Sequence, residues 1–304
     1  MGDEHDPDDT RRAALSPLLA SEQFNPLSAS VRVEFGARSR LGNQRANEDH
    51  YLIFRVGRSQ QVLASSLREA DLPGQFEEYG YLMLVADGVG PLGSGAMASR
   101  LAISTLAHLV LHFGKWNLRI DERTAADVID RAEWFYHRTA DALAARSHLE
   151  PLLAGMGTTL TATFSAGNDL FYAHVGHSRA YLFRDGHLIL LTRDDTLAQH
   201  LVERQCPVPV EPVAQDLKHI LTDALGGTGR TPDVDIERLK LWDNDCILLC
   251  TDGLTDVVDE EAIADVLANP RQLDEQCQAL IDLAVARDSN DDVTVLLASY
   301  RIPA

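Results

Sequence analysis

Apolar and polar positions alternate along the chain in short runs typical of β-strands. Three such runs precede residue 90, "VRVEFGARS", "HYLIFRVG" and "GYLMLVAD", and four more follow Gly155 as "GTTLTATFSAG", "DLFYAHVG", "RAYLFRDG" and "HLILLT". The runs "CILLCTDGL" and "DVTVLLASYRI" lie further along the chain. Gly, Asn and Asp separate neighbouring runs, and "FRDGHL" carries the Asp-Gly signal of a tight hairpin. The pattern therefore predicts antiparallel sheets.

Apolar residues at helical spacing predict helices elsewhere. Residues 96–113 and 122–148 each predict one helix, and residues 259–287 predict two short helices divided near Pro270. Strands and helices that come in blocks favour an α+β fold, in which helices cover antiparallel sheets, over alternating βαβ units. Residues 1–28 mix charges, Pro and Ser and predict a mobile N-terminal arm, so the domain is expected to span 29–304.

Charge and cysteine content narrow the classes of partner. The formal net charge of -19 argues against nucleic acid or an anionic membrane surface as partner, and it allows metal ions or basic protein segments. The four cysteines form no C-x-x-C pair, which disfavours a zinc site or a disulfide framework. No secretory signal is visible, and no apolar run reaches the ~18 residues of a membrane span. We therefore expect a cytoplasmic protein with no membrane contact.

Acidic residues recur where apolar runs begin or end. Glu48 and Asp49 begin one run, Asp87 and Asp252 end two others, and Asp291 begins the last. A carboxylate at the end of a buried strand is costly unless it is paired or bound to a cation. Hard oxygen ligands select Mg²⁺ or Mn²⁺, and two such ions can activate a water for phosphoryl transfer. The alternative is that each Asp only caps a turn.

Seven pieces of the chain resemble, in order, the motifs of the metal-dependent protein phosphatases of type 2C, the PPM family, and its bacterial branch in particular. They are "RANEDHYL", "LVADGVG", "GMGTTLTATF", "AHVGHSRAYLFRDGHLILLTRDDTLAQ", "LTDALGG", "DCILLCTDGLTDVV" and "NDDVTVLL". The quoted pieces lie between residues 45 and 297, and the resemblance covers residues 36–300, nearly the whole chain. The resemblance implies a four-layer αββα sandwich of two antiparallel sheets flanked by helices, with a two-metal site at one end.

The resemblance also implies roles for individual residues. Asp87 would bridge two Mn²⁺ or Mg²⁺ ions, and the carbonyl of Gly88 would bind one of them. Asp252 and Asp291 would bind the first ion and Glu48 the second. Asp49 would position the metal-associated water that attacks phosphorus directly, without a phosphoenzyme.

The chain departs from the family pattern at several positions. The usual phosphate-binding arginine position holds Gln44, so neighbouring Arg45 is the expected phosphate ligand, with Arg38 and Arg40 in reserve. "GHSR" places His177 where most members have an aspartate that supports a third, weaker metal, so His177 marks a possible third-metal position. Residues 193–232, which we call the flap, contain Pro and Gly clusters and are expected to lie beside the site.

Two functions of different classes remain open from the sequence. The first is a phosphatase that hydrolyses phosphoserine and phosphothreonine in proteins, with Ser/Thr kinases and their substrates as partners, acting as a monomer. The second is a pseudophosphatase that keeps the fold and binds phosphoproteins. Pro91 also stands where the family usually has a second glycine. The departures at 44, 91 and 177 favour the second function, and intact Asp87, Asp252 and Asp291 favour the first.

Overall fold

The strands of this chain form two antiparallel sheets. The computed structural model describes residues 27–68, 72, 76–114, 118–205, 213–227 and 230–303. One sheet has five strands in the order β1-β12-β11-β7-β8. The other has seven, in the order β10-β6-β5-β3-β4-β9 with β2 paired to β3. The five strands are β1 (Arg32–Arg40), β7 (Arg179–Arg184), β8 (His187–Leu190), β11 (Cys246–Cys250) and β12 (Val293–Arg301). The seven are β2 (Asp49–Gln60), β3 (Phe76–Val89), β4 (Gly157–Thr158), β5 (Leu160–Ala166), β6 (Asp169–Val175), β9 (Leu225–Gly226) and β10 (Asp235–Lys240).

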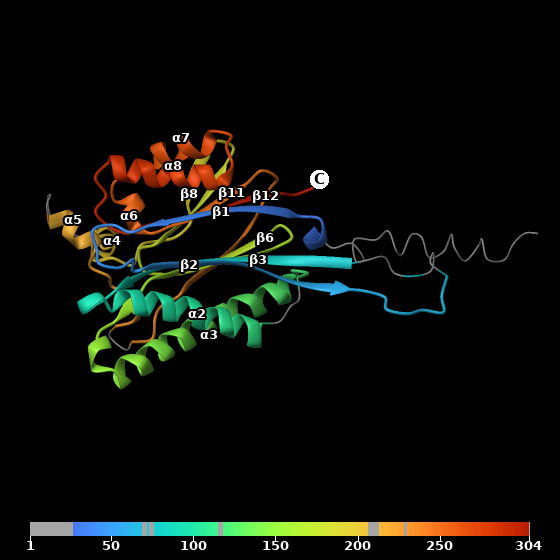
Figure 1. The fold of residues 1–304 in the computed structure, drawn as a ribbon, viewed down its shortest axis with the longest axis horizontal. Coiled ribbons are helices and arrows are strands. Elements are labelled where there is room, and N and C mark those ends of the chain that lie inside the picture. The colour runs from blue at the N-terminus through green and yellow to red at the C-terminus, as the bar shows by residue number, and fades with distance from the viewer. Residues whose placement is uncertain are drawn as a thin grey trace, which may run out of the picture.

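Helices cover the outer face of each sheet. Helices α2 (Gly95–Phe113) and α3 (Glu122–Leu149) pack on the seven-stranded sheet, and α7 (Glu260–Ala268) and α8 (Leu273–Ala286) pack on the five-stranded sheet (Figure 1). A third apolar cluster, which includes Val85 and Leu249, fills the space between the sheets. Three cores separate four layers, so the predicted αββα sandwich is confirmed.

Local sequence signals set where several elements begin and end. The Asp121 and Asp259 side chains accept the backbone N–H groups of Thr124 at 2.7 Å and Ala262 at 2.9 Å, which caps α3 and α7. Pro270 falls in the gap between α7 and α8, as predicted. Asp185 and Gly186 both have positive φ, 51° and 81°, which is the backbone of the tight β7–β8 hairpin.

Two strand regions differ from the sequence-based prediction. Strands β2 and β3 extend into the stretch around residues 58–79, which shows no apolar period, and they pair as far as Gln60 opposite Phe76. There the pairing uses polar contacts, such as the Arg55 guanidinium 4.1 Å above the Tyr79 ring. Strand β10 was not predicted either. Most of its residues are charged, so it shows little apolar alternation, and it pairs with β6, which is distant in the chain.

Helix α2 is, by length and composition alone, able to cross a membrane. In the structure one of its faces is part of the core, since Ala98, Ala102 and Leu106 are buried against the seven-stranded sheet. We therefore interpret α2 as a core helix of the sandwich.

The described part of the chain begins at Leu27, with a short 3₁₀ helix. Residues 1–26 of the predicted arm lie outside the described residues, so the arm stays a prediction. The short 3₁₀ helix Leu27–Ala29 packs on β3, and the Ser28 hydroxyl donates to the buried Glu78 carboxylate at 2.9 Å.

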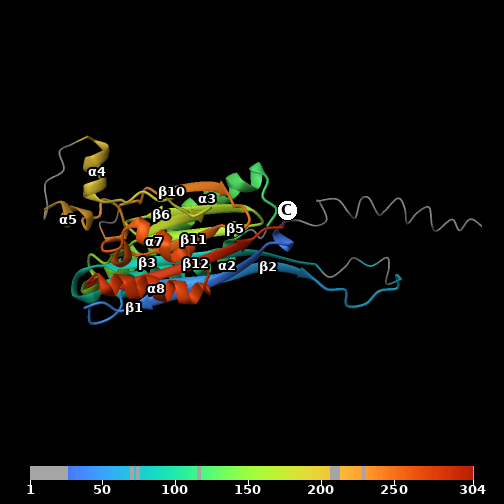
Figure 2. The ribbon, with the colours of Figure 1, turned by 90° about the horizontal axis from the view of Figure 1, so that it is seen from above.

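Three short helices gather at one end of the sandwich. Figure 1 shows α4 (Leu197–Glu203) and α5 (Val213–Lys218), both in the flap, and α6 (Asp252–Thr255) at this end. In Figure 2 the two flap helices project from the body there, and the β2–β3 hairpin projects from the opposite end.

Candidate metal centre

The two sheets bring their carboxylates to the same end of the sandwich. Asp49, the first residue of β2, lies opposite Asp87 near the end of β3 in the antiparallel register. On the other sheet, Asp252 follows the end of β11, and Asp291 precedes the start of β12, the strand that pairs with β11. Antiparallel pairing places the end of one strand beside the start of its neighbour. Residues far apart in the sequence therefore meet.

The backbone around Asp87 is held rigidly. Its N–H donates to the Thr159 hydroxyl at 2.9 Å, and its carbonyl accepts the Thr158 hydroxyl at 2.8 Å. At Gly88 a Cβ would collide with the backbone of Gly95 at the start of α2. A glycine is required at 88 because the helix start and the strand end touch, a constraint that the sequence did not reveal.

Asp292 holds the loop that carries Glu48. Its two carboxylate oxygens accept the N–H groups of Gly42 at 2.8 Å and Glu48 at 2.6 Å. The Ser99 hydroxyl on α2 donates to the Glu48 carbonyl at 2.5 Å. The sequence did not reveal this role of Asp292, because the role depends on contacts with a loop that lies about 250 residues earlier in the chain.

The Glu48 side chain lies at the start of α2. Its carboxylate is hydrogen-bonded by the backbone amides of Ala96 and Gly95, which favours the charged form. Burial and the nearby charges of Asp292 and Asp291 act in the opposite direction, and the pKa of Glu48 is raised.

Burial and mutual repulsion raise the pKa of most of these carboxyl groups. The pKa of Asp49 rises to about 8, mainly through burial, although the Thr294 and Thr251 hydroxyls oppose the shift. The Thr251 hydroxyl donates to Asp49 Oδ2 at 2.8 Å. Burial also raises the pKa of Asp87 well above its ordinary value, and the charges that add to this shift are those of aspartates, Asp252 first. Asp49 and Asp87 are thus buried carboxyl groups whose charged forms are disfavoured, which fits a site built for divalent cations.

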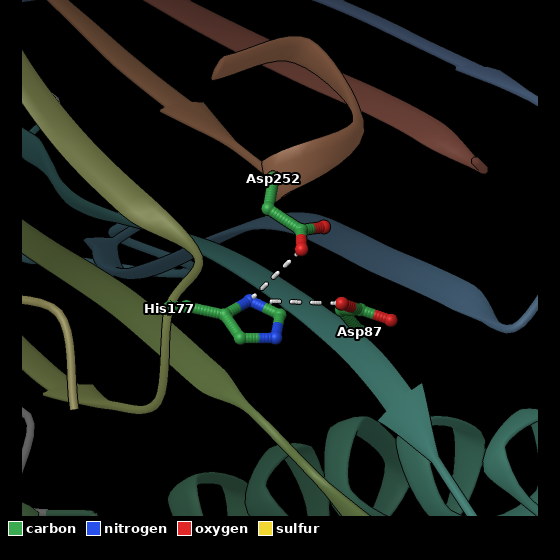
Figure 3. Close-up of side chains that lie close together, drawn as sticks. All are labelled: Asp87, His177 and Asp252. Atoms are coloured by element: carbon green, nitrogen blue, oxygen red, sulfur yellow. Dashed lines mark ion pairs between the residues drawn. The ribbon is translucent and has the colours of Figure 1, made fainter. Parts of the chain in front are cut away.

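His177 points into this cluster from the turn after β6. Its Nδ1 lies 3.6 Å from Asp252 Oδ2 and 3.8 Å from Asp87 Oδ2 (Figure 3). The residue is only 6% exposed, and Nδ1 has no hydrogen-bond partner among the described residues. Burial disfavours the charged form of Asp252, but the imidazoles of His177 and His219 outweigh burial and lower its pKa.

Two further residues of the cluster were not predicted from the sequence. His219, which follows the flap helix α5, has Nδ1 3.6 Å from Asp252 Oδ2 and Nε2 3.4 Å from Asp256 Oδ2. Hydrogen bonding to Asp252 raises the pKa of His219 to about 9. Burial raises the pKa of Asp256 to about 6. The sequence could have indicated Asp256, because it lies four residues after Asp252 and one helical turn places both side chains on the same face.

The predicted ligands are not all equally close in the structure. The ligand atoms of Asp87, His177 and Asp252 lie within 4.8 Å of one another, and so do those of His219, Asp252 and Asp256. Glu48 and Asp291 belong to neither group. Asp291 is nonetheless close enough to Asp252 for the charge of Asp252 to add to burial in raising its pKa.

The candidate phosphate ligand Arg45 lies in the loop before Glu48. Its side chain is exposed and makes no hydrogen bond or ion pair with any residue that the structure describes. The reserve Arg38 is instead paired with Asp274, its guanidinium nitrogens lying 3.1 and 3.2 Å from the carboxylate. Arg40 is exposed at the end of β1. Of the three, Arg38 is thus committed to a structural contact.

Comparison with known proteins identifies the family to which this chain belongs. The profile of the family described as Protein phosphatase 2C matches residues 72–284. This chain belongs to that family. Over 217 residues it is 37% identical to the serine/threonine protein phosphatase PstP of Mycobacterium tuberculosis, a match that covers 71% of this chain and 40% of PstP. It is 32% identical over 227 residues to the serine/threonine phosphatase Stp of Listeria welshimeri, covering 73% and 85%.

A solved member of the phosphatase 2C family carries metal in its crystal. The catalytic domain of PstP in complex with 2 manganese ions superposes with a TM-score of 0.66 at 32% identity, covering 89% of this chain and 99% of that one. This chain spans about two fifths of the length of full PstP. These findings agree with the predicted family and with the predicted sandwich. They also agree with the prediction that the protein depends on Mn²⁺ or Mg²⁺.

Proposed function

We propose that this chain is a metal-dependent protein phosphatase that hydrolyses phosphoserine and phosphothreonine. The observation that carries the proposal is the meeting of Asp49, Asp87, Asp252 and Asp291 from both sheets at one end of the sandwich. Two divalent cations, manganese or magnesium, supply when bound the positive charge that activates water and neutralises phosphate oxygens. Asp49 and Asp87, whose pKa values are raised by burial and by neighbouring aspartates, match that requirement.

The chain's own residues hold and orient the reactants. Asp87 would bridge the two ions from a strand end fixed by Thr158 and Thr159, and Gly88 would offer its carbonyl beside it. Asp252 and Asp291 would hold one ion, and Glu48 the other. Each ligand comes from a strand end or from a loop tied to one, so little ordering remains to be done when substrate binds.

Asp49 would orient the attacking water. The residue is only 5% exposed, and its carboxylate accepts a hydrogen bond from Thr251 at the end of β11. A carboxylate held beside Asp87 can accept a hydrogen bond from water and aim its lone pair at phosphorus. The hydrolysis then needs no covalent intermediate on the protein.

Arg45 would bind the phosphate. A guanidinium presents a planar set of N–H donors that matches two phosphate oxygens. The exposed Arg45 side chain lies three residues before Glu48 and has no competing partner in the described part of the chain. Arg38, by contrast, would have to leave Asp274 to play this part.

The proposed setting is intracellular signalling. Substrates would be phosphorylated proteins, including Ser/Thr kinases and their targets, and the protein would act as a monomer in the cytoplasm. The net charge of -19 disfavours nucleic acid and anionic membranes as partners. The names of the relatives do not favour the pseudophosphatase alternative.

Hydrolysis of p-nitrophenyl phosphate tests the proposal. We expect turnover with Mn²⁺, arrest by EDTA, and loss of activity in Asp252→Asn and Asp87→Asn proteins that remain folded by circular dichroism. Asp265→Asn, an exposed change on α7, serves as the matched control and should keep wild-type turnover. Wild-type rates in a folded Asp252→Asn protein would refute the two-metal proposal.

A further inference from the structure

A cavity lies between the seven-stranded sheet and the two helices, α2 and α3, that cover its outer face in Figure 1. Its volume is about 110 Å³, and it is open to solvent on one side. Voids larger than a water molecule are few in a close-packed protein interior. An engineered apolar cavity of about 150 Å³ binds benzene. The space is therefore of the size that takes up one aromatic ring, part of which can remain at the open side.

Three alanines in the wall create this space. Ala162 on β5 lies directly opposite Ala173 on β6 in the antiparallel register, and Ala132 lines the cavity from α3. A methyl group does not reach far enough to fill the gap between helix and sheet. Aromatic rings form much of the remaining wall, namely Phe135, Tyr136, Phe164, Phe171 and Tyr172. Such rings favour an aromatic ligand, because the edge of one ring attracts the face of another.

One charged side chain, that of Arg131 on α3, is found among the described residues that line the cavity. Arg131 is half-buried, and its Nη1 donates to the Phe113 carbonyl at the end of α2 at 2.6 Å. That bond holds the guanidinium in place, and its other N–H groups have no partner in the part of the chain that the structure describes. A guanidinium presents paired N–H donors that match the two oxygens of a carboxylate. The cavity therefore combines an apolar wall with a positioned partner for an anionic group.

Two exposed aromatic side chains lie close to this arginine. Phe113 supplies the carbonyl that Arg131 binds, and Trp134 follows Arg131 by three residues on α3. Their rings meet edge to face, with 5.5 Å between the centroids. Exposed apolar side chains that gather in one place mark a binding surface, whereas isolated ones are common on any protein. The surface beside Arg131 is therefore suited to an aromatic ligand, as the cavity is.

We propose that this cavity binds a small aryl carboxylate, with its ring between α3 and the sheet and its carboxylate on Arg131. The ring replaces empty space between the alanines, and the carboxylate takes the N–H donors that Phe113 leaves free. The residues that line the cavity include none of the candidate metal centre. The inference is therefore independent of the proposed function, and its test measures binding without any hydrolysis.

Fluorine NMR titration with 4-fluorobenzoate tests the site, and 4-fluorobenzyl alcohol serves as an uncharged probe of similar shape. We expect saturable binding of 4-fluorobenzoate with a Kd of about 1 mM or below, which is within reach of a ligand of this size. Arg131→Gln should weaken that binding about tenfold, because a hydrogen bond between two charged groups is lost. The same variant should bind the alcohol as the wild type does. Arg138→Gln, an exposed change further along α3, is the matched control and should keep wild-type affinity for both probes.

Two measurements locate the bound probe. Ala162→Leu on the sheet and Ala132→Leu on the helix each fill part of the cavity, so a variant that thermal melts show to be folded should bind neither probe. In the wild type, 4-fluorobenzoate should shift the methyl NMR signals of Leu106 and Val110, which line the cavity from α2. This second measurement needs no variant, so it holds even where neither filled protein folds.

Four results would overturn the proposal. The first is the absence of saturable binding to the wild type. The second is binding that survives in a folded filled variant or leaves the Leu106 and Val110 signals unchanged. The third is equal affinity of the wild type and Arg131→Gln for 4-fluorobenzoate. The fourth is binding to Trp116→Ala but not to the wild type, which would mean that the chain itself occupies the cavity.

Discussion

Replacing Asp49 by Asn should stabilise the metal-free protein while damaging its activity. The folded protein raises the pKa of Asp49 from 3.8 to about 8, mainly because the group is buried. Between these values the folded state holds a proton that the unfolded chain has released, so stability falls as pH rises from about 4 to 8. At pH 7 the ionisation of Asp49 has lowered the free energy of unfolding by about 4 kcal/mol, which is about 1.36 kcal/mol for each pH unit between 3.8 and 7.

Asn has the shape of Asp but does not ionise, and its side-chain oxygen can still accept the Thr251 hydroxyl. The stabilisation by Asp49→Asn should therefore be close to zero at pH 4 and should approach about 4 kcal/mol at pH 7. Carboxylates that do not interact with Asp49 cancel in the difference between the two proteins, whereas Asp87, whose pKa the charge of Asp49 helps to raise, adds to the gain.

The assay is urea denaturation in EDTA at pH 4, 5.5 and 7, with Asp265→Asn on α7 as the exposed control. Saturating Mn²⁺ should narrow the gap, because bound cations stabilise the wild-type carboxylates. A variant no more stable than wild type at pH 7, or one with the same gain at pH 4 and pH 7, would refute the electrostatic reasoning.

Three further predictions concern other parts of the site. Gly88→Ala should lower stability by about 1–3 kcal/mol, because its Cβ meets the Gly95 backbone; denaturation at wild-type urea concentrations would contradict this. Arg45→Ala should raise KM for p-nitrophenyl phosphate, whereas Arg38→Ala should not, since Arg38 is paired with Asp274; the opposite result would reassign the phosphate ligand. Asp292→Ala removes the acceptor for two N–H groups, and each unpaired N–H should lower stability by about 1–3 kcal/mol. Because the Glu48 loop is then released, calorimetry should find weaker Mn²⁺ binding. Unchanged Mn²⁺ affinity would mean that Asp292 does not hold this loop.

Local pattern was sufficient to predict most of the fold. The strands before residue 90 and after Gly155 are short apolar runs with strong turn signals, so their period and boundaries are visible in the sequence. Strand β10 and the outer parts of β2 and β3 are polar, and they form because distant partners complete their pairing. Pairing of this kind cannot be recognised in a short stretch of the sequence.

The candidate site was predictable where chemistry alone selects the residue. Asp87 follows an apolar run directly and Asp252 follows one after a single threonine, so a carboxylate at a strand end could be recognised. Asp292 and His219 could not be recognised in this way, because their roles depend on the Glu48 loop and on the position of the flap. The tie between Gly88 and Gly95 depends likewise on how α2 meets β3.

The most direct test of the account is phosphate release from a phosphothreonine peptide as a function of Mn²⁺ bound per chain. Metal-stripped protein should be inactive, and activity should appear as the second Mn²⁺ binds, because two ions are needed to activate water and neutralise the phosphate. Asp87→Asn should show neither the second Mn²⁺ nor the activity. Phosphate release from metal-free wild type, or no release with two Mn²⁺ bound, would contradict the account.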